Sequence, residues 1–592
     1  MRTKLPRIGS PAYHVLLACV AIFILGPLGG ISAAFMNFSI GFFVGGQVLA
    51  GILGSTVTLS YGPEGKHGAN YMQTMAASVA GMAAMAPLVQ AMLWLGLPVP
   101  PAWKLILYYL SIGMFGVGVG MLYTPILVDR LRLTYPSGLA VANILRALTD
   151  PQLLRLSVAR LGGSVLAGYA GGLVTTKVAA LAGTGLSFST FGGGMIVGAR
   201  IAIPALVVAV IGWSVTPFLV AIHWLGPGDH YRKIGFIISL GGIMGAAALD
   251  LTIILIQTVR RLRAQSEPAA APAADWQRVN LLRLVLWVAF WGAAVVWLGS
   301  QLLQQPVFYL VVAVGLCFVF VLTNGIAMGI SDFNPISSAF VMSVFILAAL
   351  GLHDPGIGLL CASVLAIATS EGGDMQQDRS TGWRLGTNRV NQFRYQVIGI
   401  AAGAVLTVAL AKLFMSAYPI LKVDQFIHAN LPGAQKWQSA YTYKIVGALR
   451  GITRNQPEVM EALALGIGLG LLIETARKLI KRWWEYRDFV ANSRLGKAAD
   501  FLLDAVLLPS PYAYAFGGFV ELHSVVWWGL GGVSASLFEV VRARLSRRER
   551  KRPDAELPSD MSTTSLVGGG LIAGDALAAL TIGVYGLLRA MM

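Results

Sequence analysis

Three carboxylates and two amides lie within eight residues, directly after a long apolar block. They are Glu371, Asp374, Gln376, Gln377 and Asp378. Crowded carboxylates repel one another when ionised, so one of them can hold and exchange a proton near neutral pH. We therefore interpret the three acids as candidate proton-coupling residues and the two glutamines as candidate substrate contacts. The two glycines between the acids, Gly372 and Gly373, are expected to break the helix. The alternative for this segment is a solvated cytoplasmic loop.

Two further polar stretches interrupt apolar sequence. A charged turn leads into Asn70 and Gln73, whose spacing of three places both amides on one face of a helix. Asp332 and Asn334 lie in a serine-rich stretch between strongly apolar flanks, and Pro335 suits the first turn of the helix that follows. All four side chains are candidate substrate contacts. The alternatives are an interfacial helix entrance for the first pair and a helix-capping role for Asp332.

Tyr135 and Ser137 are candidate substrate contacts at a break in the chain. Pro136 and Gly138 interrupt the helical pattern before a short apolar piece. A short hydrophobic segment after a break is typical of a discontinuous membrane helix, whose free N–H groups can bind an anionic group. An ordinary turn is the alternative.

Asp575, inside an apolar block near the C-terminus, is a further candidate for proton coupling.

The elements that carry these residues are predicted to be membrane-spanning helices. Of the 592 residues, 56% are hydrophobic and only 12% are charged, with a mean hydropathy of +0.69. A soluble domain would carry about 25% charged residues. The apolar blocks are about 20 residues long, which is the length that a helix needs to cross a bilayer. We predict an all-α polytopic membrane protein with about 14–16 transmembrane helices, some of them discontinuous.

The formal charge of +17 indicates how the chain is oriented across the membrane and does not indicate binding to nucleic acid. The basic residues lie in short loops between apolar blocks, as the positive-inside rule expects of cytoplasmic loops. We expect the basic runs at 477–487 and 542–552 and the N-terminus to be cytoplasmic, in a plasma membrane or a bacterial inner membrane. The chain is divided into an N-terminal helical half (1–258), a basic Ala/Pro-rich cytoplasmic linker (259–283) and a C-terminal helical half (284–592).

The two halves are predicted to be related. Residues 70–81 align without gaps on residues 388–399, at an offset of 318 positions. Both segments are expected to run from the cytoplasm outward, which would make the duplication parallel.

The cysteines Cys19, Cys317 and Cys361 lie inside apolar blocks without a CxxC pattern, so we expect core residues and neither a metal site nor a cofactor.

At these polar stretches the sequence resembles the oligopeptide transporter (OPT) family, closest in motifs to its yellow-stripe-like branch and bacterial relatives. Residues 133–138 (Leu-Thr-Tyr-Pro-Ser-Gly) are close to a motif of that branch. Residues 373–382 resemble the Met-Gln-Asp-x-Lys-Thr-Gly segment, with an additional Gln and with Arg and Ser in place of a basic–Lys pair. Residues 571–575 resemble a C-terminal Leu-Ile-Cys-Gly-Asp-Gly, with Ala for Cys, and residues 70–73 an early Asn-Thr-x-x-Gln element.

The resemblance implies symport of small peptides, glutathione-like compounds or metal chelates, driven by protons. We expect a secondary transporter that works by alternating access in the lipid bilayer, and no enzymatic activity. The sequence leaves a homo-oligomer open. An intramembrane enzyme is one alternative, although a tyrosine–aspartate partner for the acidic cluster and a His-Glu-x-x-His element are both missing. A passive channel is the other alternative, and it would not need clustered carboxylates.

The predicted topology can be tested in the linker. Cysteines introduced within residues 259–283 should stay unlabelled when an impermeant thiol reagent is added outside intact cells, because the Lys/Arg excess places this loop in the cytoplasm. Labelling from outside would contradict the assignment.

Overall fold

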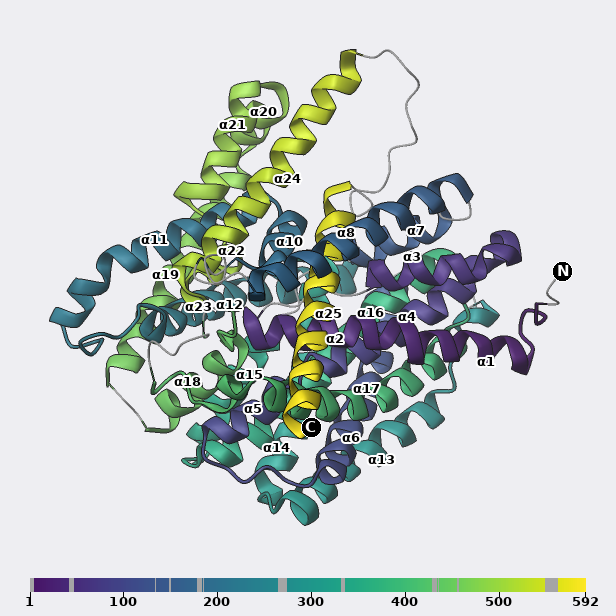
Figure 1. The fold of residues 1–592 in the computed structure, drawn as a ribbon, viewed down its shortest axis with the longest axis horizontal. Coiled ribbons are helices and arrows are strands. Elements are labelled where there is room, and N and C mark those ends of the chain that lie inside the picture. Colours follow the sequence, from purple (N-terminus) through teal and green to yellow (C-terminus); the bar gives the residue numbers. More distant parts are fainter. Residues whose placement is uncertain are drawn as a thin grey trace.

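The structure is a computed structural model that describes most of the chain. The described residues are 5–41, 47–133, 135–147, 151–177, 184, 186–264, 274–331, 336–428, 434, 436–454, 457–548 and 563–592. Helices cross one another at many angles throughout these ranges, which contain no strand (Figure 1).

In the first half the helices are α1 (Pro11–Val20), α2 (Gly26–Ser39), α3 (Gln47–Thr58), α4 (Gly65–Ala83), α5 (Pro87–Trp94), α6 (Ala102–Thr124), α7 (Pro136–Ala147), α8 (Pro151–Lys177), α10 (Phe188–Val197), α11 (Ala199–Ala221) and α12 (Arg232–Ala264). The remaining helices are α13 (Leu281–Leu303), α14 (Val307–Ser331), α15 (Ile336–Ala349), α16 (Pro355–Leu385), α17 (Arg389–Ala417), α18 (Ala440–Arg454), α19 (Pro457–Arg482), α20 (Trp484–Asn492), α21 (Arg494–Leu502), α22 (Pro511–Tyr514), α23 (Phe516–Phe519), α24 (Leu522–Arg548) and α25 (Thr563–Met591).

The prediction of an all-α polytopic membrane protein is confirmed. Within the described ranges, 12 helical runs are long and apolar enough to cross a membrane. One of these runs, Ala50–Trp94, includes most of α3 and all of α4 and α5. The chain reverses direction at Gly62, which has a positive φ, so that α4 packs against α3. Shorter apolar helices occur at Phe188–Val197 and Ala339–Ala349. The short helix expected after the break at Pro136 is α7, which has 12 residues.

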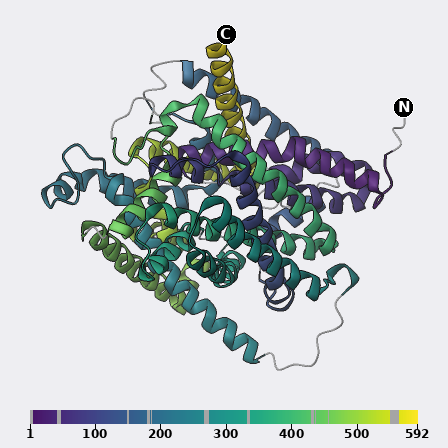
Figure 2. The ribbon, with the colours of Figure 1, turned by 90° about the horizontal axis from the view of Figure 1, so that it is seen from below.

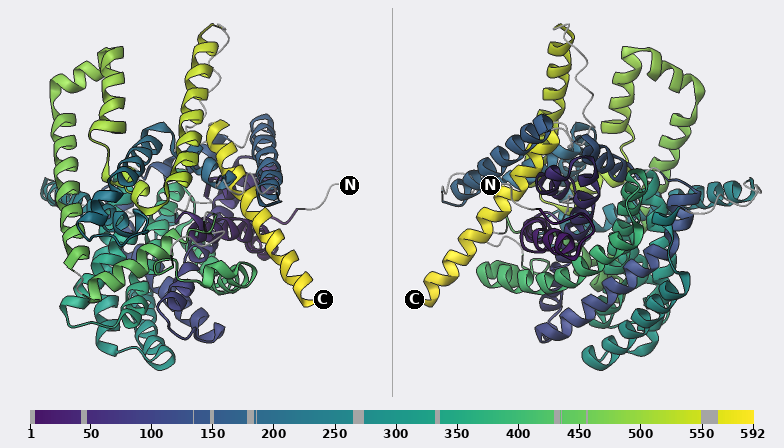
Figure 3. Two further views of the ribbon diagram at one scale, coloured as in Figure 1. Left: turned by 60° about the vertical axis from the view of Figure 1, so that its left-hand side comes forward. Right: turned by 90° about the vertical axis from the view of Figure 1, so that its right-hand side faces the viewer.

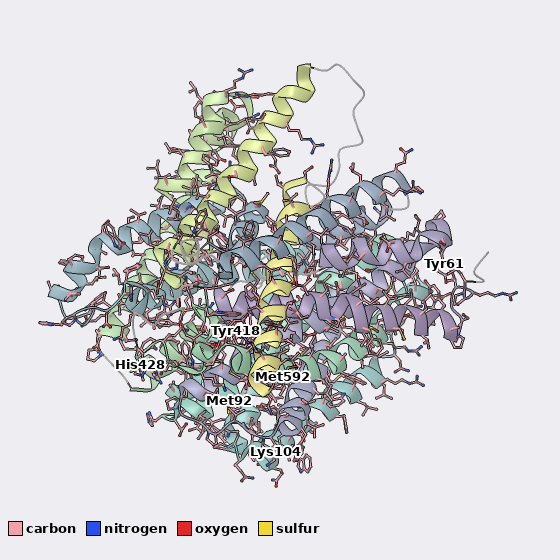
Figure 4. The ribbon with its side chains drawn as sticks, viewed as in Figure 1. Tyr61, Met92, Lys104, Tyr418, His428 and Met592 are labelled. Atoms are coloured by element: carbon pink, nitrogen blue, oxygen red, sulfur yellow. The ribbon has the colours of Figure 1, made fainter. Side chains whose placement is uncertain are left out.

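The chain places α16 and α4 at the centre of the bundle. In both runs 94% of the most apolar window is buried inside the protein, against 22% for the run that contains α13. The outer helices therefore present apolar side chains outward, while α4 and α16 are surrounded by protein. Side chains fill the spaces between the helices, and Tyr418 lies beside α25, where its hydroxyl donates to the carbonyl of Ala579 (Figure 4).

The predicted helix break at Gly372 and Gly373 is wrong, because α16 runs without interruption from Pro355 to Leu385. These residues are buried, so the alternative of a solvated loop is wrong as well. Gly372 meets Gly116 and Gly120 of α6, where the two backbones approach closely. A glycine in a helix costs about 1 kcal/mol relative to alanine, which close helix packing in a membrane can offset.

The two segments of the predicted repeat lie side by side on α4 and α17. Tyr71 stacks on Tyr395 with ring centroids 5.0 Å apart, and Gly399 and Gly403 pack further along α4 against Met75 and Val79. Each contact joins residues 324 positions apart, so the two helices run parallel. This arrangement agrees with a parallel duplication, and the duplication itself stays a prediction.

One side of the molecule carries two basic segments that the sequence places in the cytoplasm. The pair α20–α21 and the end of α24 project beyond the other helices on the same side (Figure 3). The long α12, which ends at Ala264 within the predicted linker, extends to a different edge of the molecule (Figure 2). The cytoplasmic location of these segments, like the division into three regions, remains a prediction.

The close crossing of α6 and α16 can be tested at Gly116. A Cβ atom there would lie 2.6 Å from the Cα of Ala368, so Gly116→Leu should push the helices apart and destabilise the fold by about 1–3 kcal/mol. The measurement is the melting temperature of the purified protein in detergent. Gly315→Leu on the exposed face of α14 is the matched control, since no atom lies within 4 Å of a Cβ there. Equal melting temperatures for the two variants would contradict the crossing.

Candidate functional site

Glu371 and Asp374 lie on the face of α16 that packs against α4. A Cβ atom at Gly81 of α4 would lie 2.9 Å from Oε1 of Glu371 and 3.1 Å from Oδ2 of Asp374. We call Glu371 and Asp374 the carboxylate pair. The absence of a side chain at Gly81 leaves room for both acids between the two helices.

Glu371 is the most isolated acid in this region. It is fully buried, and neither carboxylate oxygen has a hydrogen-bond partner within the described part of the chain. Asp374, one turn further along α16, is only partly buried. An ionised carboxylate without a partner is costly away from water, whereas the protonated acid costs far less. Glu371 therefore has the surroundings of a group that carries a proton.

Asp378 is held by α4 and lies beside α17. Gln73 Nε2 donates to Asp378 Oδ1 at 2.8 Å, while Gln392 Nε2 donates to the backbone carbonyl of Asp378 at 2.8 Å and to Thr74 Oγ1 at 2.9 Å. Asn70, three residues before Gln73, is fully buried with neither amide atom paired in the described ranges. The structure thus brings the predicted Gln73 to the acidic segment of α16, with Asn70 buried one turn before it on α4.

Gln376 and Gln377 lie on the faces of α16 that pack against α14 and the start of α7, and Tyr135 precedes α7. The buried Gln376 packs against Gly325 of α14, and neither of its amide atoms has a described partner. Gln377 lies beside the start of α7, where a Cβ atom at Gly138 would be 2.8 Å from its carbonyl oxygen. Thr381, one turn further along α16, donates its hydroxyl to the carbonyl of Gly138 at 3.0 Å. Tyr135 adopts a positive φ of 43°, and its N–H donates to the carbonyl of Gly329 in α14.

Three predicted residues have no described side chain. Asp332 and Asn334 fall between the end of α14 and the start of α15, outside the described residues. Ser137 belongs to the first turn of α7, but its side chain is not among those described. Their proposed contacts with substrate stay predictions.

Asp575 lies in a different cluster from the acids of α16. Its Oδ2 accepts from the hydroxyls of Ser187 and Ser189 at 2.8 and 2.9 Å and from the N–H of Ser189 at 3.0 Å. Its Oδ1 lies 3.3 Å from Nζ of Lys436. This many hydrogen-bond partners favours a role for Asp575 in holding α25 against the start of α10.

The sequence analysis did not single out three residues that complete the surroundings of Asp378. Arg379 follows Asp378 on α16, and Gln392 and Gln396 lie one turn apart on α17. Arg379 Nη2 donates to Gln396 Oε1 at 3.3 Å. The spacing of four between the two glutamines was the available signal, because it places both amides on one face of an apolar helix. We call Asn70, Gln73, Asp378, Arg379, Gln392 and Gln396 the polar junction.

The fold and this buried polar face define an integral, multi-pass membrane protein in which the acidic segment of α16 is enclosed by other helices. The sequence matches the family described as OPT oligopeptide transporter protein over residues 8–585. The chain therefore belongs to this family.

Two curated proteins of Oryza sativa subsp. japonica are similar to the chain. The metal-nicotianamine transporter YSL2 is 24% identical over 339 residues, which are 51% of this chain and 48% of the relative. The probable metal-nicotianamine transporter YSL8 is 23% identical over 477 residues, which are 68% of this chain and 66% of the relative. Each match spans less than two thirds of the relative's length.

The structural role of Asp575 predicts a loss of stability on substitution. Asp575→Ala removes the acceptor of two buried serine hydroxyls and one N–H, which should destabilise the protein by about 1–3 kcal/mol. The melting temperature in detergent measures this effect. Asp229→Ala is a comparison nearer the surface, where the acid pairs with Lys233 in a partly exposed ion pair of smaller expected value. An Asp575→Ala protein as stable as Asp229→Ala would contradict the role.

Proposed function

We propose that this protein is a proton-coupled symporter that moves its substrate by alternating access. Membership of the OPT family and the bundle of membrane-spanning helices support transport. The observation that carries proton coupling is Glu371, a fully buried acid whose two oxygens have no partner in the described ranges. The proposed substrates are small peptides, glutathione-like compounds or metal chelates, since both relatives are named metal-nicotianamine transporters.

The packing of α4 on α16 suggests how proton binding can follow conformational change. Because Gly81 has no side chain, the carboxylate pair lies close to the α4 backbone at this position. A small separation of α4 from α16 would admit water to Glu371 and allow its proton to leave. Closure would require a proton, or a cationic group of the substrate, on the carboxylate pair before the two helices meet again.

The polar junction provides the proposed substrate contacts next to these acids. Gln73 and Asp378 are already hydrogen-bonded to each other, so a substrate would exchange with or extend that bond. Gln376, on the α14 side, is a further contact. We propose that the membrane is a plasma membrane or a bacterial inner membrane, with the N-terminus in the cytoplasm.

Amide substitution of Glu371 should separate substrate exchange from proton coupling. A neutral glutamine resembles the protonated acid but binds and releases no proton, so Glu371→Gln should keep counterflow exchange and lose accumulation driven by a pH gradient. The measurement is uptake of labelled trialanine, glutathione and a nickel–nicotianamine complex into proteoliposomes. Asp374→Asn and Asp378→Asn are tested in parallel, because either acid can share the proton with Glu371.

Glu461→Gln is the matched control, since this glutamate is exposed on α19. It should accumulate substrate like the unchanged protein. If all three single amide variants of α16 still concentrate substrate under an imposed pH difference, the acids of α16 do not carry the coupling proton. If uptake by the unchanged protein is indifferent to the gradient, the protein is a passive channel.

A further inference from the structure

The strongest unexplained feature of the molecule is a buried, incompletely paired guanidinium. Arg379 is 1% exposed, and its only described hydrogen bond runs from Nη2 to Gln396 Oε1. Its Nε and Nη1 atoms, and the Nε2 atom of Gln396, have no partner within the described residues. Three donor atoms from α16 and α17 are therefore buried together without an acceptor.

A purely structural arginine in this protein has different surroundings. Arg389 is similarly buried, and it holds Asp129 through two hydrogen bonds of 2.6 and 2.8 Å. Arg379 has no such partner, although Asp378 precedes it, because Oδ1 of Asp378 accepts from Gln73 and Oδ2 is unpaired. Burying a guanidinium without a carboxylate is costly, since arginine stays charged under all ordinary conditions.

We propose that Arg379, together with Gln396, binds a carboxylate group of the transported substrate. This inference rests on the proposed transport function and narrows its substrate class. The planar guanidinium matches the geometry of a carboxylate, and the amide of Gln396 adds a further donor beside it. The bound carboxylate supplies the hydrogen-bond acceptors that Nε and Nη1 of Arg379 lack in the described ranges.

The other half of the polar junction presents unpaired acceptors. Oδ1 of Asn70, Oε1 of Gln73, Oδ2 of Asp378 and Oε1 of Gln392 are buried without a described partner. Acceptors of this kind suit an ammonium or amide N–H group. The junction therefore presents both unpaired donors, on Arg379 and Gln396, and unpaired acceptors, so it fits a small zwitterion built from amino acids better than a simple anion such as phosphate. The substrate class is therefore amino-acid-derived molecules with a free carboxylate and a nearby N–H group.

Trialanine and trialaninamide provide a direct test, because they differ only in the C-terminal carboxylate. Binding to the purified full-length protein is followed by the ligand-dependent rise in melting temperature. The unchanged protein should bind trialanine at least about tenfold more tightly than the amide, as expected of a charged hydrogen bond. Arg379→Gln and Gln396→Leu should weaken trialanine binding about tenfold or more and leave binding of the amide unchanged. Arg482→Gln, at an exposed site on α19, is the matched control and should bind like the unchanged protein.

Arg379→Lys keeps the positive charge, and its binding is measured instead if Arg379→Gln does not fold. It should retain part of the preference for the acid, because lysine supplies the charge without the planar fork. Equal binding of acid and amide by the unchanged protein, or equal losses for both ligands in the variants, would overturn the inference. Acid-selective binding without pH-driven accumulation would instead overturn the proposed coupling and leave carboxylate recognition intact.

Discussion

Hydrocarbon offers no partner to a polar side chain, and this constraint determines the surroundings of α16. Its segment from Glu371 to Arg379 contains four ionisable groups that would be costly in contact with lipid. The chain encloses the segment with α4, α6, α14 and α17, which all pack directly on it. Close approach needs small residues, so Gly116 and Gly120 lie on α6, Gly81 on α4 and Gly325 on α14.

In the described part of the molecule the buried polar groups are of two kinds. Some are fully paired, such as Asp575 with its serines and Arg389 with Asp129, and these pairs hold elements together. Others, such as Glu371 and Arg379, are buried with unpaired atoms in the described ranges. A structural role does not account for the second kind, because each unpaired group costs free energy that a paired or apolar residue would avoid. We propose that protons and substrate supply the missing partners during transport.

Sequence reasoning found the parts of this arrangement that depend on local pattern. Apolar blocks of helical length predicted the fold class, and the break at Pro136 predicted the start of α7. The spacing of Asn70 and Gln73 predicted a shared face that reaches the acids of α16. The related halves remain a prediction, although α4 and α17 lie parallel and in contact.

The rest depended on partners that are remote in the sequence. Gly372 and Gly373 favour a helix break locally, whereas the close packing of Gly372 against α6 and α14 involves residues that are remote in the sequence. The serines that pair with Asp575 are 388 and 386 residues away, so its ion pair and hydrogen bonds have no local signature. The same is true of Arg379, because its unpaired Nε and Nη1 atoms are evident only in three dimensions.

The most direct test of the account is substrate-driven proton movement by the unchanged protein. Proteoliposomes that contain a pH-sensitive dye, with equal pH on both sides and the membrane voltage clamped by an ionophore, receive trialanine from outside. The account predicts acidification of the lumen that depends on trialanine and disappears in Glu371→Gln, although that variant still exchanges labelled trialanine. Uptake of trialanine by the unchanged protein without any change in lumenal pH would contradict proton coupling through the buried acid of α16.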